Sequence, residues 1–182
     1  MSQLIARLDS SDPDFDAAFA RLLVSPAESD SALAETVSSI IAAVAIEGDA
    51  ALLRFTNQFD GRALSDSANL KVPSSALVSA LQAIDPAVRV ALEHAAARIC
   101  DFHERQLGQS WHYRDDTGSL LGQRVSAMDR VGLYVPGGRA SYPSSVLMNA
   151  IPAKVAGVSE VIMVVPAPSD EINPVVLAAA QL

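Results

Sequence analysis

The segment Tyr134-Val-Pro-Gly-Gly138 has the composition of a loop that could cradle a phosphate-bearing ligand. A β-rich run ends at its start, its two glycines let a backbone approach a ligand closely, and a helix is predicted soon after it. The free N–H groups and partial positive charge of a helix N-terminus favour an anion there, and Ser144 or Ser145 would cap this helix. The three spaced glycines of the dinucleotide fingerprint and the Lys-Ser/Thr of a Walker A loop are both missing. A tight strand-to-helix turn that binds nothing explains the pattern equally well, so the residues leave both readings open.

Other residue types that could do chemistry are sparse and poorly spaced. His94, His103 and His112 lie nine residues apart, which fits no compact metal pattern. Cys100 is the single cysteine and is expected to be a buried structural thiol. No Ser-His-Asp order and no cluster of metal ligands can be assembled from the rest. The sequence therefore predicts no catalytic residue and no metal site within these 182 residues.

Pro152 and Lys154 lie in the helical stretch that follows the glycines. A proline inside a helix costs about 3 kcal/mol, so either the helix breaks at Pro152 or its surroundings compensate. We expect Lys154 to be a solvated side chain and not a ligand contact.

Cap signals and hydrophobic spacing predict the elements that must position this loop. Asp12-Pro13 and Asp85-Pro86 each combine an N-cap with a proline at the start of a helix, and Asn173-Pro174 repeats the signal. We expect helices through Phe15–Leu23, Leu33–Val44, Leu52–Phe59, from Ser74, through Val88–Gln106, Ser144–Ala156 and after Pro174. We expect a short extended piece at 69–72, a hairpin of 111–114 with 120–125, and strands at 131–135 and 160–165.

Residues 131–165 thus read as strand, glycine loop, helix and strand, which is one βαβ unit with parallel strands. We predict a helical arm at residues 1–25, a mainly helical part with a hairpin at 26–129, and the first βαβ unit of a cofactor-binding domain at 130–182. The fold class is α/β. Two parallel strands are few for such a sheet, and the last helix lacks a C-cap, so we expect the sequence to be truncated.

Composition excludes several classes of function. The net charge is −8, with no basic patch to neutralise phosphates, which argues against nucleic acid. No apolar run approaches the roughly 20 residues of a membrane span, and no signal-peptide core is present. A lone cysteine cannot form an internal disulfide, so we expect a reduced, cytoplasmic protein.

Several segments together closely resemble the histidinol dehydrogenase family. The resemblance is strongest at Arg130-Val-Gly-Leu-Tyr-Val-Pro-Gly-Gly138 and at Tyr142-Pro-Ser-Ser-Val-Leu-Met-Asn-Ala-Ile-Pro-Ala-Lys-Val-Ala-Gly157. The resemblance to this family extends along essentially the whole chain. Upstream segments that also resemble it are Gly48-Asp49-Ala-Ala-Leu52, Phe59-Asp60-Gly61, Phe102-His103-Glu-Arg-Gln106 and Leu121-Gly-Gln-Arg124.

The resemblance implies a zinc-dependent homodimer that oxidises L-histidinol through L-histidinal to L-histidine while two NAD are reduced. It implies incomplete Rossmann-like domains related to the aldehyde dehydrogenase fold. It also implies that Tyr134 contacts NAD, with Gly137, Gly138, Ser144 and Ser145 lining the same cleft.

One departure from the family is large, because its members are much longer and this chain matches roughly their first two fifths. The resemblance places the zinc ligands and the Glu-His acid–base pair in the absent part, so no catalytic or metal residue is carried over. We therefore expect an N-terminal portion that is inactive alone. The alternative is a non-catalytic remnant, or a fragment that binds a nucleotide or a partner.

Overall fold

The computed structural model describes residues 7–23, 27–136, 142–168 and 171–182. The chain divides into two compact units, residues 1–52 (unit 1) and 53–182 (unit 2). The predicted segment boundaries near residues 25 and 129 remain predictions.

Helices make up most of the described part of unit 1. It contains α1 (Phe15–Leu23), α2 (Ala27–Glu47) and the start of α3 (Asp49–Asp60), in agreement with the hydrophobic spacing. Asp12 and Pro13 precede α1, which begins at Phe15, so the predicted cap at Asp12 and first helical position at Pro13 were wrong by two residues. The carboxylate of Asp12 accepts the backbone N–H of Asp14 at 3.0 Å in the turn before the helix. Gly48 ends α2 with a φ of 60°, a conformation that glycine adopts at little steric cost.

Charge is distributed unevenly between the two units. Residues 1–52 hold nine Asp or Glu and only two Arg, whereas residues 53–182 hold twelve acidic and eleven basic residues. Nearly all of the net negative charge of the chain is therefore carried by unit 1.

Unit 2 begins with the rest of α3, followed by the 3₁₀ helix η1 (Ser67–Leu70), α4 (Ser74–Ala83) and α5 (Pro86–Glu104). The expectation of an extended piece at 69–72 was wrong for its first half. The carboxylate of Asp66 accepts the N–H of Ala68 at 2.9 Å, and this cap starts the 3₁₀ turn. Asp85 caps α5 as predicted, by accepting the N–H of Ala87 at 2.7 Å.

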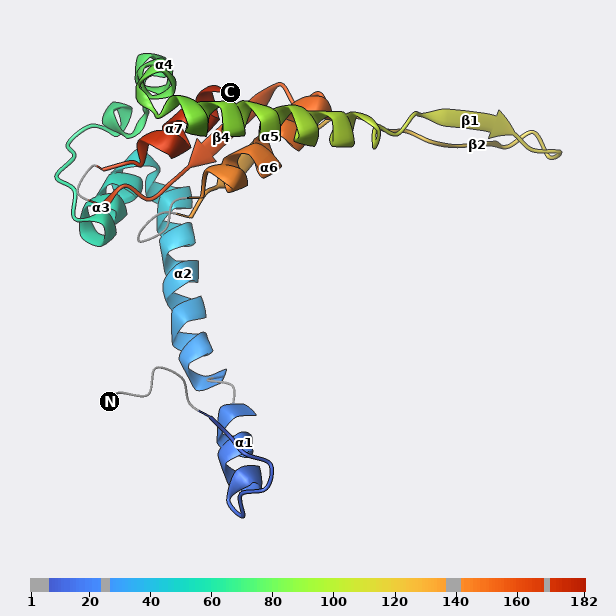
Figure 1. Cartoon of the computed structure of the whole chain (residues 1–182). Coiled ribbons are helices and arrows are strands. Elements are labelled where there is room, and N and C mark those ends of the chain that lie inside the picture. The colour runs from blue at the N-terminus through green and yellow to red at the C-terminus, as the bar shows by residue number, and fades with distance from the viewer. Residues whose placement is uncertain (1–6, 24–26, 137–141, 169–170) are drawn as a thin grey trace. The chain divides into compact units, whose positions relative to one another are not determined.

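A two-stranded antiparallel hairpin follows α5, and Figure 1 shows it in yellow. Its strands are β1 (Trp111–Arg114) and β2 (Leu120–Gln123), and Trp111 pairs with Gln123. The prediction of this hairpin is confirmed, although β2 ends two residues early. All eight strand residues are exposed.

The predicted βαβ unit is present as β3 (Arg130–Tyr134), α6 (Pro143–Val155) and β4 (Glu160–Val164). The two strands are parallel, with Gly132 beside Ile162 and Tyr134 beside Val164. Helix α6 continues through Pro152, so of the two expected outcomes the break at this proline does not occur. Lys154 is exposed, as expected.

One apolar cluster holds these elements together. The last helix, α7 (Pro174–Gln181), starts where Asn173 accepts the N–H of Val175, as predicted, and it lies against α4 and α6 (Figure 1). The buried members of the cluster come from α5, the end of β3, α6 and α7: Leu92, Val135, Val146, Leu147, Val176, Ala178 and Ala179. The start of α6 and the end of β3 are therefore fixed by the same core.

Among the described residues, no single helix has both the length and the apolar character to cross a membrane. In the same described ranges, the pair formed by residues Ser67–Ala83 and α5 passes on length and composition, but the chain bends by 113° between its two members.

Leu147→Ala tests the importance of the cluster. Leu147 is 2% exposed, so truncating it leaves a cavity, and we expect the free energy of unfolding to fall by about 2–5 kcal/mol in urea denaturation. The matched control is Met148→Ala, because its neighbouring side chain is 63% exposed and should cost within about 0.5 kcal/mol. Equal losses from the two variants would contradict this packing.

The stability of the loop between β1 and β2 should depend on pH through Asp115. The hydroxyl of Thr117 donates to Asp115 at 2.7 Å, and this bond, with backbone N–H donors, holds the pKa of the Asp115 carboxyl below its ordinary value. Because the pKa of Asp115 is lower in the folded chain than in the unfolded chain, its carboxylate stabilises the folded loop at pH values above the unfolded pKa. This stabilisation is lost as the pH falls through the folded pKa of Asp115. We expect Thr117→Val to raise the pKa of Asp115 in a carbon-13 NMR titration. Thr36→Val, on α2, should leave it unchanged.

Candidate cofactor-binding site

Tyr134 is the last residue of β3 and presents its side chain to solvent. It is 63% exposed, while the next residue, Val135, is fully buried in the core. The N–H of Val135 donates to the carbonyl of Val164 at 3.0 Å, which holds this point of the chain beside β4. The phenol therefore stands on a fixed backbone at the carboxyl end of a parallel strand, where ligands of open α/β sheets bind.

The start of α6 differs from the predicted cap. Tyr142 occupies the N-cap position and Pro143 the first helical position, so neither Ser144 nor Ser145 caps the helix. Proline is favoured at that first position because its missing N–H would be unpaired there anyway. Ser144 is exposed and Ser145 half-buried in the first turn, where the backbone N–H of Ser145 donates to the carbonyl of Tyr142 at 3.0 Å.

The core fixes the two sides of this candidate site. Tyr134 immediately precedes Val135, and Ser145 immediately precedes Val146, and both valines belong to the same buried cluster. Two further predicted residues, Gly137 and Gly138, lie outside the described residues. Tyrosine and serine hydroxyls beside a helix N-terminus can donate hydrogen bonds to a phosphate or a ribose. These residues thus suit a polar, anionic ligand such as a nucleotide.

The histidines are spread over two elements. His94 and His103 lie on α5 and His112 lies on β1. His103 is half-buried, with its ring edge-on to Phe102 at 5.3 Å between centroids. Within the described ranges, no group of three or more His, Cys, Asp or Glu is placed to hold a metal ion.

Cys100 is half-exposed rather than fully buried, which corrects the expectation. Its thiol donates to the carboxylate of Glu104 at 3.4 Å, and this hydrogen bond raises the pKa of the thiol. A raised pKa leaves less thiolate at neutral pH, so Cys100 is a poor nucleophile.

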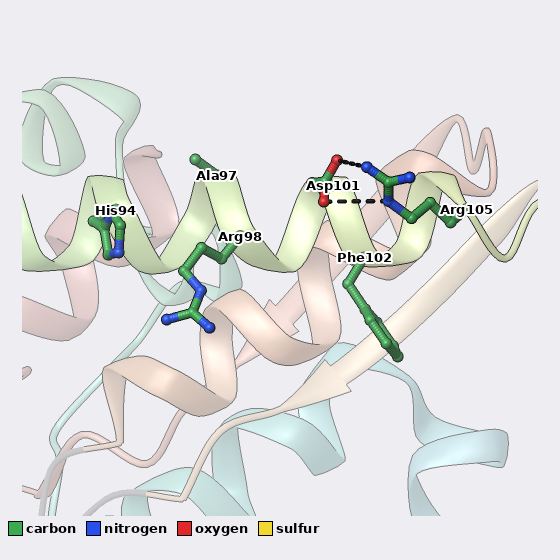
Figure 2. Close-up of a pocket in the computed structure, with 6 residues that line it drawn as sticks. All are labelled: His94, Ala97, Arg98, Asp101, Phe102 and Arg105. Atoms are coloured by element: carbon green, nitrogen blue, oxygen red, sulfur yellow. Dashed lines mark hydrogen bonds and ion pairs between the residues drawn. The ribbon is translucent and has the colours of Figure 1, made fainter.

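A depression along α5 was not anticipated from the sequence. Figure 2 shows its lining, which comes entirely from this helix: His94, Ala97, Arg98, Asp101, Phe102 and Arg105. Asp101 and Arg105 form an ion pair at 2.8 Å. The spacing of 94, 98, 101 and 105 is that of one helix face, and this signal could have found the depression. It contains no nucleophile with an adjacent base, so nothing there indicates catalysis.

Comparison with known proteins identifies the family. The family model described as histidinol dehydrogenase matches residues 24–182. The histidinol dehydrogenase of Bordetella parapertussis is 53% identical over 179 residues, which cover 98% of this chain and 41% of that protein. The enzyme of Pseudomonas syringae pv. syringae is 54% identical over 176 residues, covering 97% and 39%.

The solved structures agree with the curated relatives. The crystal structure of histidinol dehydrogenase from Elizabethkingia anophelis matches 81% of this chain and 34% of its own, at a TM-score of 0.73 and 29% identity. The chain corresponds to an N-terminal portion and spans about two fifths of the length of the curated relatives. On the match to residues 24–182 and the identity to these relatives, the chain belongs to the histidinol dehydrogenase family of oxidoreductases.

Proposed function

We propose that this chain is the N-terminal part of an NAD-dependent histidinol dehydrogenase, which oxidises L-histidinol through L-histidinal to L-histidine. The observation that carries the proposal is the match to a curated histidinol dehydrogenase along 98% of the chain at 53% identity. Such identity along nearly the whole chain favours descent from an enzyme with the same activity.

Tyr134, Ser144 and Ser145 are the described residues that we assign to NAD, with Gly137 and Gly138 as further contacts. NAD would supply the hydride acceptor for both oxidations. The exposed phenol of Tyr134 offers a hydrogen-bonding and stacking surface, and the first turn of α6 offers hydroxyls near a partial positive charge. The role of this chain is thus to bind and orient the cofactor.

The zinc that the resemblance implies does not fit the described residues, because no group of three or more potential ligands is found among them. No step through the metal is assigned to this chain. We propose that the metal ligands and the acid–base pair belong to the part of the family's sequence beyond the match, and that these 182 residues alone are inactive.

A cytoplasmic homodimer that takes L-histidinol as its small-molecule substrate completes the proposal. The many exposed large apolar side chains, among them Leu22, Ile41 and Trp111, support association with further polypeptide. These exposed apolar side chains are also compatible with the alternative function, a fragment that binds a partner. Such a fragment would catalyse no oxidation.

A chimera tests the proposed activity. The 182-residue chain would be extended at Leu182 by the part of the Bordetella parapertussis relative that follows the matched segment. With zinc, L-histidinol and NAD, we expect the chimera to form NADH, measured by absorbance, and the 182-residue chain to form none. NADH production by the shorter chain would refute its inactivity. A folded chimera that binds NAD and leaves L-histidinol unchanged would overturn the proposed function.

Tyr134→Ala in the chimera tests the cofactor site. Loss of a hydrogen bond and a stacking surface, worth about 1–2 kcal/mol, should raise the KM for NAD by about tenfold while kcat changes less. Tyr113→Ala on the exposed hairpin is the matched control and should leave both constants unchanged. Similar constants for the two variants would remove Tyr134 from the site.

A further inference from the structure

The two strands of the βαβ unit end side by side at the edge of the sheet that carries the candidate cofactor site. β3 and β4 are parallel, and Tyr134 at the end of β3 pairs with Val164 at the end of β4. The segments that follow the two strands therefore leave the sheet at the same edge, which is where open α/β sheets bind ligands. The segment that leads from β4 to α7 is thus placed to contact the same ligand as Tyr134.

The segment between β4 and α7 is anchored at both ends. Near its start, Ala167 is buried, with only 4% of its surface exposed. At its end, Asn173 caps α7 by accepting the N–H of Val175 at 2.8 Å. Between these anchors, the backbone N–H of Glu171 donates to the carbonyl of Pro168 at 3.2 Å. Glu171 is therefore held by its own segment, close to the carboxyl end of β4.

The side chain of Glu171 is exposed and can accept hydrogen bonds from a ligand. Among the residues that the structure describes, none donates a hydrogen bond to its carboxylate or forms an ion pair with it. An ionised carboxylate has two acceptor oxygens, which match the two adjacent hydroxyls of a ribose. In dinucleotide-binding βαβ units, an acidic residue beyond the crossover helix accepts the 2′-hydroxyl of the ribose in this way.

Basic side chains in the described part of residues 130–182 lie toward the opposite edge of the sheet. Arg130 is the first residue of β3, and Lys154 is in the last turn of α6, just before β4 begins. Arg139 follows the glycines and lies outside the described residues. NADP-binding domains use an arginine to hold the 2′-phosphate. At the edge beyond β4, the described residues offer the carboxylate of Glu171 and no such cation.

The position of the reacting ring decides which half of a dinucleotide meets Glu171. Helix N-termini favour phosphate, so we expect the pyrophosphate at the start of α6. We assign no catalytic group to the described residues, so the nicotinamide must extend toward residues outside them. The adenosine half then lies over the carboxyl end of β4, where Glu171 is found.

We propose that Glu171 accepts hydrogen bonds from the adenosine ribose of NAD and selects NAD over NADP. The 2′-phosphate of NADP would remove the hydroxyl that donates to this carboxylate and bring negative charge against it. Such repulsion of the wrong ligand is a common source of specificity. The inference rests on the proposed function in taking NAD as the ligand of this edge. It adds the residue that chooses between the two dinucleotides.

The ratio of kcat/KM for NAD to that for NADP tests the proposal in the chimera. Glu171→Gln removes the charge and keeps the size of the side chain. We expect it to raise kcat/KM for NADP by at least about tenfold and to lower that for NAD severalfold, mainly through KM. Glu171→Asp keeps the charge and should retain the preference for NAD. A Glu171→Gln chimera with the parent's ratio would overturn the proposal.

Glu160→Gln is the matched control. It removes the same charge at the amino end of β4, at the edge away from the candidate site. Its ion pair with Arg130 is exposed, and such pairs contribute little to stability. We expect the ratio of the two kcat/KM values to stay at that of the parent. An equal change in both variants would attribute the preference to the overall charge and refute a contact at Glu171.

Direct binding separates this inference from the proposed function. Titration of NADH and of NADPH, followed by their fluorescence without L-histidinol, should show tighter binding of NADH. Glu171→Gln should narrow the difference by about tenfold, and added salt should narrow it in the parent because ions screen the repulsion. A chimera with this preference that leaves L-histidinol unchanged would refute the proposed function and support the ribose contact. An active chimera in which Glu171→Gln alters neither affinity would do the reverse.

Two further outcomes are decisive. A chimera that is folded by circular dichroism and binds neither dinucleotide would overturn both proposals. If the chimera does not fold, residues 166–173 of this chain are grafted into the full-length Bordetella parapertussis enzyme, with and without Glu171→Gln. An unchanged ratio of kcat/KM values between these two grafted enzymes would then refute the role of Glu171.

Discussion

Burial of apolar side chains between the β3–β4 sheet and the helices α5, α6 and α7 is the constraint on which the core of unit 2 depends. Val135 and Val146 are its largest fully buried side chains, and they come from the two ends of one strand-to-helix connection. Ala178 and Ala179 let α7 approach closely, because small side chains keep helices near one another. The same burial turns Tyr134 outward and fixes the first turn of α6, so the geometry of the candidate site is a by-product of packing.

Much of this arrangement could be predicted from local sequence signals. Asp85-Pro86 and Asn173-Pro174 start helices in the structure because an acceptor side chain before a proline satisfies N–H groups that the helix leaves unpaired. The same reasoning gave a wrong prediction for Ser144 and Ser145. Pro143 occupies the first helical position, so both serines lie two or three residues after the N-cap residue Tyr142. The prediction of an extended piece at 69–72 was wrong for a related reason. The Asp66 cap starts a 3₁₀ helix at Ser67, and β-propensity does not indicate such a cap.

Function was less accessible from the residues than fold. Glycines after a strand suggest a ligand loop, but a plain turn has the same sequence pattern, and the ligand loop stays a prediction that only the resemblance to histidinol dehydrogenases favours. Catalysis needs groups brought together from distant parts of a sequence, and the described residues hold no such cluster.

The uneven distribution of charge has a consequence for how copies of this protein behave in solution. Nine acidic and two basic residues in the first 52 give unit 1 a net charge of 2 − 9 = −7, while unit 2 is close to neutral. Units of like charge repel one another within a Debye length, about 8 Å at physiological ionic strength. We therefore expect the first units of two copies to repel one another, which opposes the aggregation that exposed apolar side chains promote, and we expect added salt to weaken this repulsion.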